Sequence, residues 1–149
     1  MREVTSGWTY TTNRGREMAI LHIKESKVIG NRVKDAAGVH GFLKEHLANL
    51  DQESFWVIGL DTEHKIILCE LLFLGGMSCS VVDPKILFRR LLIGECAAFI
   101  VAHNHPSGNP TPSSEDVFLT QRIKQGAEIL DLKFLDHLLI AGDHVVRVQ

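Results

Sequence analysis

Three side chains of types that commonly bind metal ions lie close together in this sequence. His103 and His105 are separated by one residue, and Asp116 follows eleven positions after His105. In an extended strand, side chains two positions apart point to the same face, so we expect the two imidazoles to lie together. Two histidines and one carboxylate leave one tetrahedral position open, which is typical of catalytic zinc. A water molecule at that position would have its pKa lowered to about 7.

Simpler local roles could account for each of these residues separately. Ser113 could be a helix N-cap with Asp116 as its capping-box partner. These roles do not explain why two histidines on one face directly follow an apolar strand, so we expect a metal site. If Thr111 is the N-cap instead, Pro112 takes the first helical position and the Ser113 hydroxyl is free to point at the metal.

The segments around these residues are predicted to bring them together. Residues 96–102 are continuously apolar, which suits a strand covered on both faces. The loop 103–111 contains two prolines and one glycine and can fold back. A helix over 112–130 then carries Asp116 in its first turns. The other expected elements are strands at 18–29, 53–60, 65–74, 133–141 and 145–148, and helices at 35–50 and from Asp83-Pro84 to near Gly94. This order predicts an α/β fold with one mixed sheet flanked by helices.

Length and composition indicate one mildly acidic domain. The 149 residues suit a folded domain over 18–149 preceded by a flexible arm or loose edge strand over 1–17. A net charge of −2 and a pI near 6.4 argue against a broad basic face for nucleic acid. Three cysteines without a CxxC pair indicate reduced thiols. With no apolar segment of about 18 residues and no signal-peptide pattern, we expect a cytoplasmic protein without a membrane span.

The motif His103-Asn-His105, Ser113 and Asp116 resembles the JAMM signature of MPN-type (JAB) metallopeptidases. The stretch HNHPSGNPTPSSED, followed by TQRIKQGAEILDLKFLDHLLI, is similar to the RadC family in particular. This resemblance implies an MPN fold like the cytidine-deaminase α/β sandwich, with one zinc ion per chain on His103, His105 and Asp116. It implies hydrolysis of an amide or isopeptide bond in a peptide or protein, with Ser113 helping to stabilise the oxyanion.

The resemblance also implies an upstream glutamate that exchanges protons with the attacking water. Glu53, at the start of the strand after the first helix, has the matching position. Glu70 is the alternative, because a carboxylate within the apolar run 66–74 would have a raised pKa. Asp136 and His137 form a further pair typical of the family. They could support the site from behind the ligands or make a strand-edge hydrogen bond.

Two other functions remain as alternatives to a hydrolase. The first is a DNA-repair-associated nucleic-acid protein or a metal-dependent nuclease. The acidic pI disfavours it, and in HNH nucleases the three named residues are not consecutive. Longer RadC proteins have an N-terminal helix-hairpin-helix-like region, where we see only a short polar arm. The second is a non-catalytic MPN scaffold, which usually lacks the metal ligands. A nucleobase deaminase is excluded, because neither His-x-Glu nor Pro-Cys-x-x-Cys is present.

Overall fold

The computed structural model describes residues 7–13, 16–22, 38–39, 41, 43–44, 51–75 and 82–149, with the backbone alone over 7–22. Its strands form a seven-stranded sheet in the order β1-β2-β4-β3-β5-β6-β7. The strands are β1 (Gly7–Asn13), β2 (Arg16–His22), β3 (Ser54–Leu60), β4 (Ile66–Leu74), β5 (Ala98–Asn104), β6 (Lys133–Ala141) and β7 (His144–Arg147). Only the β5–β6 pair is parallel among these strands. The mixed sheet confirms the predicted α/β class.

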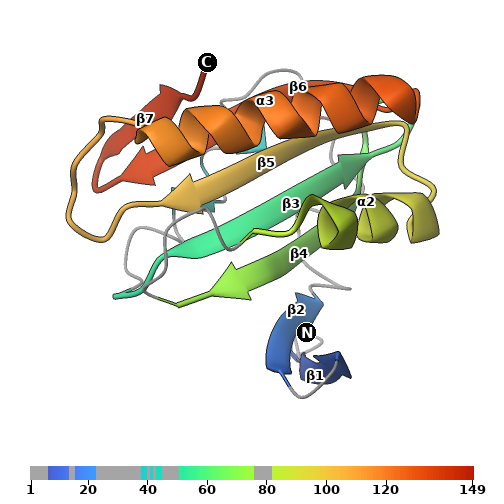
Figure 1. Ribbon diagram of the computed structural model, residues 1–149, viewed down its shortest axis with the longest axis horizontal. Coiled ribbons are helices and arrows are strands. Elements are labelled where there is room, and N and C mark those ends of the chain that lie inside the picture. Colours follow the sequence, from blue (N-terminus) through green and yellow to red (C-terminus); the bar gives the residue numbers. More distant parts are fainter. Residues whose placement is uncertain are drawn as a thin grey trace, which may run out of the picture.

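Helices cover both faces of this sheet. Helices α2 (Pro84–Ile93) and α3 (Ser114–Ile129) lie over one face (Figure 1), where Phe99 and Val101 of β5 belong to the core. The opposite face buries Ile100 and Ala102 with Val39 and Leu43, which belong to the predicted helix 35–50. The described residues of that segment, 38–39, 41 and 43–44, are helical. Neighbouring residues of β5 therefore serve two separate cores.

The connection from β5 through α3 to β6 sets the position of the predicted metal ligands. β5 is buried along its whole length, as its continuous apolar sequence indicates. Parallel strands need a crossover, and α3 supplies it by returning the chain across the sheet. The end of β5 and the start of α3 therefore lie at the same end of the molecule (Figure 1), which brings the residues after Ala102 close to the first turn of α3.

The helix starts test the sequence predictions directly. Asp83 is the N-cap of α2 as predicted, and its carboxylate accepts a hydrogen bond from the Lys85 amide at 2.9 Å. Of the two residues considered for the N-cap of α3, Thr111 does not take this role. Ser113 is the N-cap and forms a complete capping box with Asp116. Ser113 takes the N-cap position because its hydroxyl and the Asp116 carboxylate each accept a hydrogen bond from a backbone amide that has no partner within the helix.

The N-terminal part of the chain was predicted to be a flexible arm or a loose edge strand, and its described residues form strands at the edge of the sheet. β1 pairs with β2, which pairs with β4 through Leu21 and Leu71. The strand predicted over 18–29 begins at Arg16, and residues 23–30 are outside the described part of the chain. The domain division at residue 17 stays a prediction, and it falls inside β2. None of the described helices is long and apolar enough to cross a membrane.

Candidate metal centre

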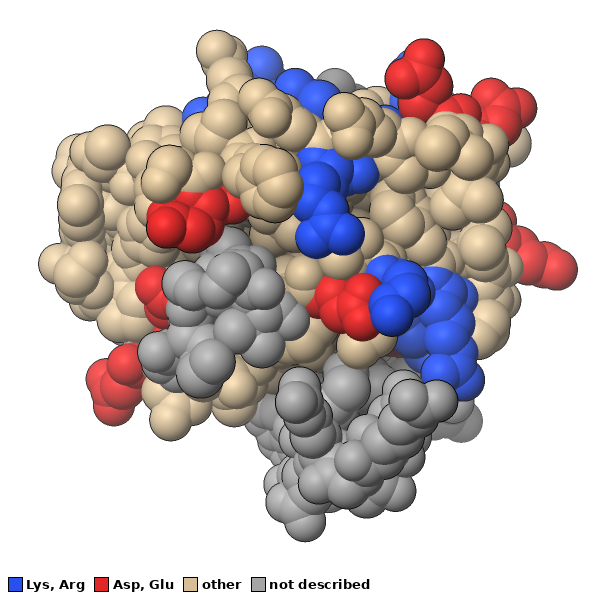
Figure 2. All heavy atoms as spheres, viewed as in Figure 1, with Lys and Arg blue, Asp and Glu red and all other residues tan. Residues whose placement is uncertain are grey.

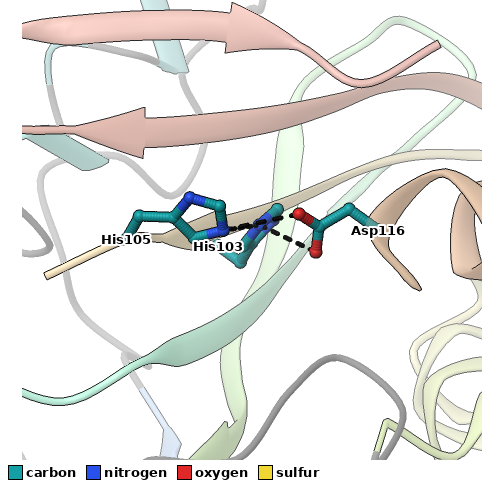
Figure 3. A group of neighbouring side chains, drawn as sticks. All are labelled: His103, His105 and Asp116. Carbon is teal, nitrogen blue, oxygen red and sulfur yellow. Dashed lines mark hydrogen bonds and ion pairs between the residues drawn. The ribbon is translucent and has the colours of Figure 1, made fainter. Parts of the chain in front are cut away.

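The three predicted ligands meet at the junction of β5 and α3. Figure 3 shows the His103 and His105 rings pointing toward the Asp116 carboxylate. His103 Nε2 lies 3.2 Å from His105 Nε2 and 3.2 Å from Asp116 Oδ1, and His105 Nε2 lies 3.4 Å from Asp116 Oδ2. A tetrahedral zinc ion with bonds near 2.0–2.1 Å has edges of roughly 3.3–3.4 Å between its ligand atoms. The three side chains can therefore hold a metal ion with little rearrangement.

Burial makes this cluster suited to a cation. The side chains of His103 and Asp116 are 2% and 1% exposed, whereas that of His105 is 14% exposed. A buried carboxylate needs a compensating positive charge or strong hydrogen bonds. A divalent ion between the three side chains would supply that charge. Among these three side chains, His105 is the most exposed to solvent.

Hydrogen-bond directions orient the His105 ring. Its Nδ1 lies 3.0 Å from the Asn109 carbonyl oxygen, and its backbone amide donates to the Ile140 carbonyl at 2.9 Å. A carbonyl oxygen only accepts, so Nδ1 carries the proton. Nε2 then has a free lone pair, which is directed toward the metal position.

A longer chain of hydrogen bonds does the same for His103. The Thr120 hydroxyl donates to the Asp116 backbone carbonyl at 2.8 Å, so its oxygen accepts from His137 Nδ1 at 2.6 Å. His137 Nε2 must then accept from His103 Nδ1 at 2.7 Å. Each step fixes the next, because the terminal carbonyl has no proton to give. The neutral His103 ring thus has its proton on Nδ1, and its Nε2 lone pair faces the metal position.

His137 is therefore in contact with the site, whereas its neighbour Asp136 is not. Burial, and secondly the adjacent His103, lower the pKa of His137 to about 3, so the ring is neutral near pH 7. The Asp136 carboxylate pairs with Arg147 at 2.8 Å and accepts from the His137 amide at 2.9 Å. The sequence indicated the pair Asp136-His137, but it did not indicate Thr120, because a threonine in a helix carries no distinctive spacing signal.

An open hollow of about 500 Å³ adjoins two of the three candidate ligands, His105 and Asp116. It is lined by Glu53, His105, Ser107, Asn109, Thr111, Pro112, Ser113, Glu115 and Asp116. Both predicted catalytic residues, Glu53 and Ser113, thus line the same cavity as His105 and Asp116. The Ser113 hydroxyl accepts from the Asp116 amide at 3.1 Å, and the Ser113 amide donates to Asp116 Oδ2 at 2.7 Å. The expectation of a Ser113 hydroxyl without a capping role is therefore wrong.

Glu70, the alternative to Glu53, has a different environment. Its side chain is 2% exposed, and its carboxylate receives two hydrogen bonds from Arg90 of α2, at 2.6 and 2.5 Å. It is not among the residues that line the hollow. This ion pair fastens α2 to β4. The position of the two carboxylates therefore favours Glu53 as the group next to the metal ligands.

Taken together, the mixed sheet between helices, the His-x-His pair after a buried strand and the aspartate at a helix start define an α/β protein with a candidate JAB-type metal centre. The chain belongs to the family of RadC-like JAB domains, which matches residues 33–148.

Curated relatives support this assignment. The chain is 36% identical to a UPF0758 protein of Pasteurella multocida over 124 residues, which is 83% of this chain and 55% of that protein. It is 38% identical to a UPF0758 protein of Psychromonas ingrahamii over 124 residues, with the same shares, and 37% identical to one of Pseudomonas syringae over 127 residues, 85% and 56% of the two chains. The chain thus spans about half the length of these relatives. Their shared name states no activity.

Proposed function

We propose that this protein is a zinc-dependent hydrolase of the metallopeptidase type, which cleaves an amide or isopeptide bond in a peptide or protein. The observation that carries the proposal is the convergence of His103 Nε2, His105 Nε2 and the two oxygens of the Asp116 carboxylate, at distances near the edge lengths of a tetrahedral site. Three protein ligands leave a fourth position for water or substrate, as in catalytic zinc sites. The adjoining hollow gives that position access to a substrate.

The residues of the hollow have complementary roles in such a reaction. When bound, zinc would lower the pKa of a water molecule to about 7 and polarise the scissile carbonyl. The Glu53 carboxylate accepts a proton from the attacking water and delivers it to the leaving nitrogen. The Ser113 hydroxyl donates to the oxyanion, because the bond from the Asp116 amide occupies only a lone pair of its oxygen. In the free protein the Glu115 carboxylate competes for this hydroxyl. Hydrogen bonds from the Glu115 backbone, then from the Ser114 and Ser113 side chains, lower the pKa of Glu115.

His137 supports the site from behind His103. Its neutral ring holds the His103 tautomer through the chain that ends at the Asp116 carbonyl. Partners of this kind orient metal-binding histidines and raise their affinity for the ion. Asp136 contributes indirectly, through its hydrogen bond to the His137 amide.

Zinc content and peptide hydrolysis test this proposal together. Protein purified without chelators should contain about one zinc ion per chain, and His103→Ala should lose it. Glu53→Gln should keep the zinc but lose hydrolysis of a peptide library. Asp51→Asn is the matched control, because it removes an exposed carboxylate two residues from Glu53. Protein with no zinc, or a fully active Glu53→Gln variant, would refute the assignment.

A nucleic-acid substrate is disfavoured by the charges around the hollow. Its ionisable lining consists of Glu53, Glu115, Asp116 and the histidine ligand His105, with no Lys or Arg among the described residues that form it. On the face shown in Figure 2, basic side chains occur in small separate groups among acidic ones. Phosphate backbones require clustered basic residues. Tight DNA binding at low salt that weakens steeply with added salt would revive the DNA-repair or nuclease alternative.

We also propose a cytoplasmic location, on the basis of the cysteines. Cys69 and Cys96 are buried free thiols in the described part of the chain, and Cys79 is outside it. Proteins that keep free thiols are typical of reducing compartments.

A further inference from the structure

Asn104, the residue between the two histidine ligands, contacts the segment that carries Glu53. Its side chain is on the opposite face of β5 from His103, and the residue is 2% exposed. The carboxamide oxygen accepts from the Ser54 amide and from the Ser54 hydroxyl, both at 2.7 Å. The carboxamide nitrogen donates to the Gln52 carbonyl at 3.0 Å. Asn104 thus binds the backbone on both sides of Glu53.

These bonds continue the pairing of β3 and β5 beyond the end of the main-chain ladder. The ladder between the two strands ends at the pair Phe55 and His103. One residue further, the Asn104 side chain takes the place of a main-chain partner for Ser54. Two more bonds complete the arrangement: Trp56 Nε1 donates to the Ser54 hydroxyl at 3.0 Å, and the Gly75 amide donates to the Glu53 carbonyl at 3.0 Å.

The chemistry of the site requires a carboxamide here. The Ser54 amide only donates and the Gln52 carbonyl only accepts, so the residue between them must accept and donate at once. This pattern also fixes which end of the Asn104 amide is oxygen. A leucine of similar size would make neither bond, and an aspartate would set a carboxylate oxygen against the Gln52 carbonyl.

We infer that Asn104 is a positioning residue, which fixes Glu53 relative to the metal ligands on either side of Asn104 in the sequence. The inference rests on the proposed function, because it takes Glu53 as the proton-transferring group. A short segment thereby carries two metal ligands and the support for the proton acceptor. A misplacement of about 1 Å at such a group can lower a rate about 100-fold.

The experiment compares Asn104→Leu and Ser54→Ala with wild type in zinc-loaded, folded protein. Both variants should keep zinc affinity within about twofold and leave KM unchanged. The kcat should fall roughly 10- to 100-fold in Asn104→Leu, and less in Ser54→Ala, which keeps the bonds of Asn104 to the Ser54 amide and the Gln52 carbonyl. In a Glu53→Gln background, measured in single turnovers, neither substitution should lower the residual rate further. Unchanged kcat in both variants, or a loss that adds fully to that of Glu53→Gln, would overturn the inference.

Amide hydrogen exchange in the metal-free protein gives a readout that is independent of activity. The Ser54 amide should exchange faster in Asn104→Leu, whereas the Ile58 amide in the middle of β3 should not change. Equal Ser54 exchange in both proteins would also overturn the inference. If Asn104→Leu does not fold, Asn104→Asp replaces it in the kinetic comparison, because it loses the donor to the Gln52 carbonyl. If Glu53→Gln is fully active, the proposed proton transfer fails, while Ser54 exchange still reports whether Asn104 holds this segment.

Discussion

At the scale of single residues, the candidate metal centre depends on where two protons lie. The Asn109 carbonyl requires a proton on His105 Nδ1, and the Asp116 carbonyl requires one on His103 Nδ1 through Thr120 and His137. With the Nδ1 protons fixed in this way, each ring in its neutral form has its Nε2 lone pair directed toward a metal ion. Phe55 packs against His103 and His137, with ring centroids 6.4 and 5.7 Å away, and limits their rotation.

Replacing Thr120 by valine tests this hydrogen-bond chain. The change removes the hydroxyl, so His137 Nδ1 loses its acceptor and His103 is no longer held in one tautomer. We expect zinc affinity to fall roughly 10- to 100-fold, as for other residues that orient metal-binding histidines. Competition with a chromophoric chelator measures this. Thr62→Val in the exposed turn after β3 is the control, and equal affinities in the two variants would exclude a role for the chain.

At the scale of elements, the site depends on how α3 packs against β6 and α2. The capping box joins the helix start to the ligand Asp116, and the parallel crossover sets the helix over β5. Close packing fixes the other end of α3. A Cβ atom on Gly126 would lie 2.5 Å from Phe88 Cε2, and Phe88 packs edge-on against Phe99 of β5.

Gly126→Ala should consequently destabilise the protein, although alanine is the better helix former. The gain in helix propensity is about 1 kcal/mol, whereas overpacking costs about 1–3 kcal/mol. We expect a net loss of about 1 kcal/mol in the free energy of unfolding by denaturant. Glu128→Ala, exposed on the same helix, should be nearly neutral. Phe88→Leu should relieve the contact, so a double variant whose losses simply add would contradict this explanation.

Two buried cysteines, Cys69 and Cys96, should make the stability of the protein depend on pH in the alkaline range. Burial, and secondly the Glu70 carboxylate, raise the pKa of Cys69 to about 12 and that of Cys96 to about 11. Above about pH 9 the unfolded thiols lose protons that the folded ones keep. The unfolded state then binds fewer protons, so the free energy of unfolding falls as pH rises from 9 toward 11–12. A Cys69→Ala/Cys96→Ala variant should show a shallower decline across this range. An equal decline would show that other groups cause it.

At the scale of the whole molecule, the metal centre joins parts of the chain that are far apart in sequence. It lies where β5 ends, α3 begins and β6 passes behind, and Glu53 approaches from the start of β3. A metal ion at this junction would bind the folded state alone. Metal binding and folding should therefore be linked.

Zinc should accordingly raise the thermal unfolding temperature of chelator-treated protein. At a free zinc concentration 100 times the Kd, the added stability is about 2.7 kcal/mol. Differential scanning fluorimetry across a zinc titration measures this shift. Asp116→Asn should abolish it, because the ligand set loses its negative charge. A shift of the same size in that variant would indicate binding elsewhere.

Much of the site was predictable because it follows from local rules. Side-chain alternation in a strand puts His103 and His105 on one face, and the loop and helix that follow return Asp116 toward them. The apolar run of β5 and the cap of α2 depend on neighbouring residues as well. The cap of α3 was harder to predict, since Thr111 and Ser113 are both good N-cap residues and lie only two positions apart.

The sequence by itself therefore predicted the candidate ligand set, and it determined the order of the main elements and the mildly acidic charge. Only the tertiary structure decided that Glu53 rather than Glu70 lies at the hollow, that Thr120 and His137 set the tautomer of His103, and that Asn104 holds the start of β3. Each of these depends on contacts between residues 17 to 52 positions apart. Such contacts follow from the register of the paired strands and the packing of α3 on the sheet. Both are set by the burial of apolar side chains over the whole sheet.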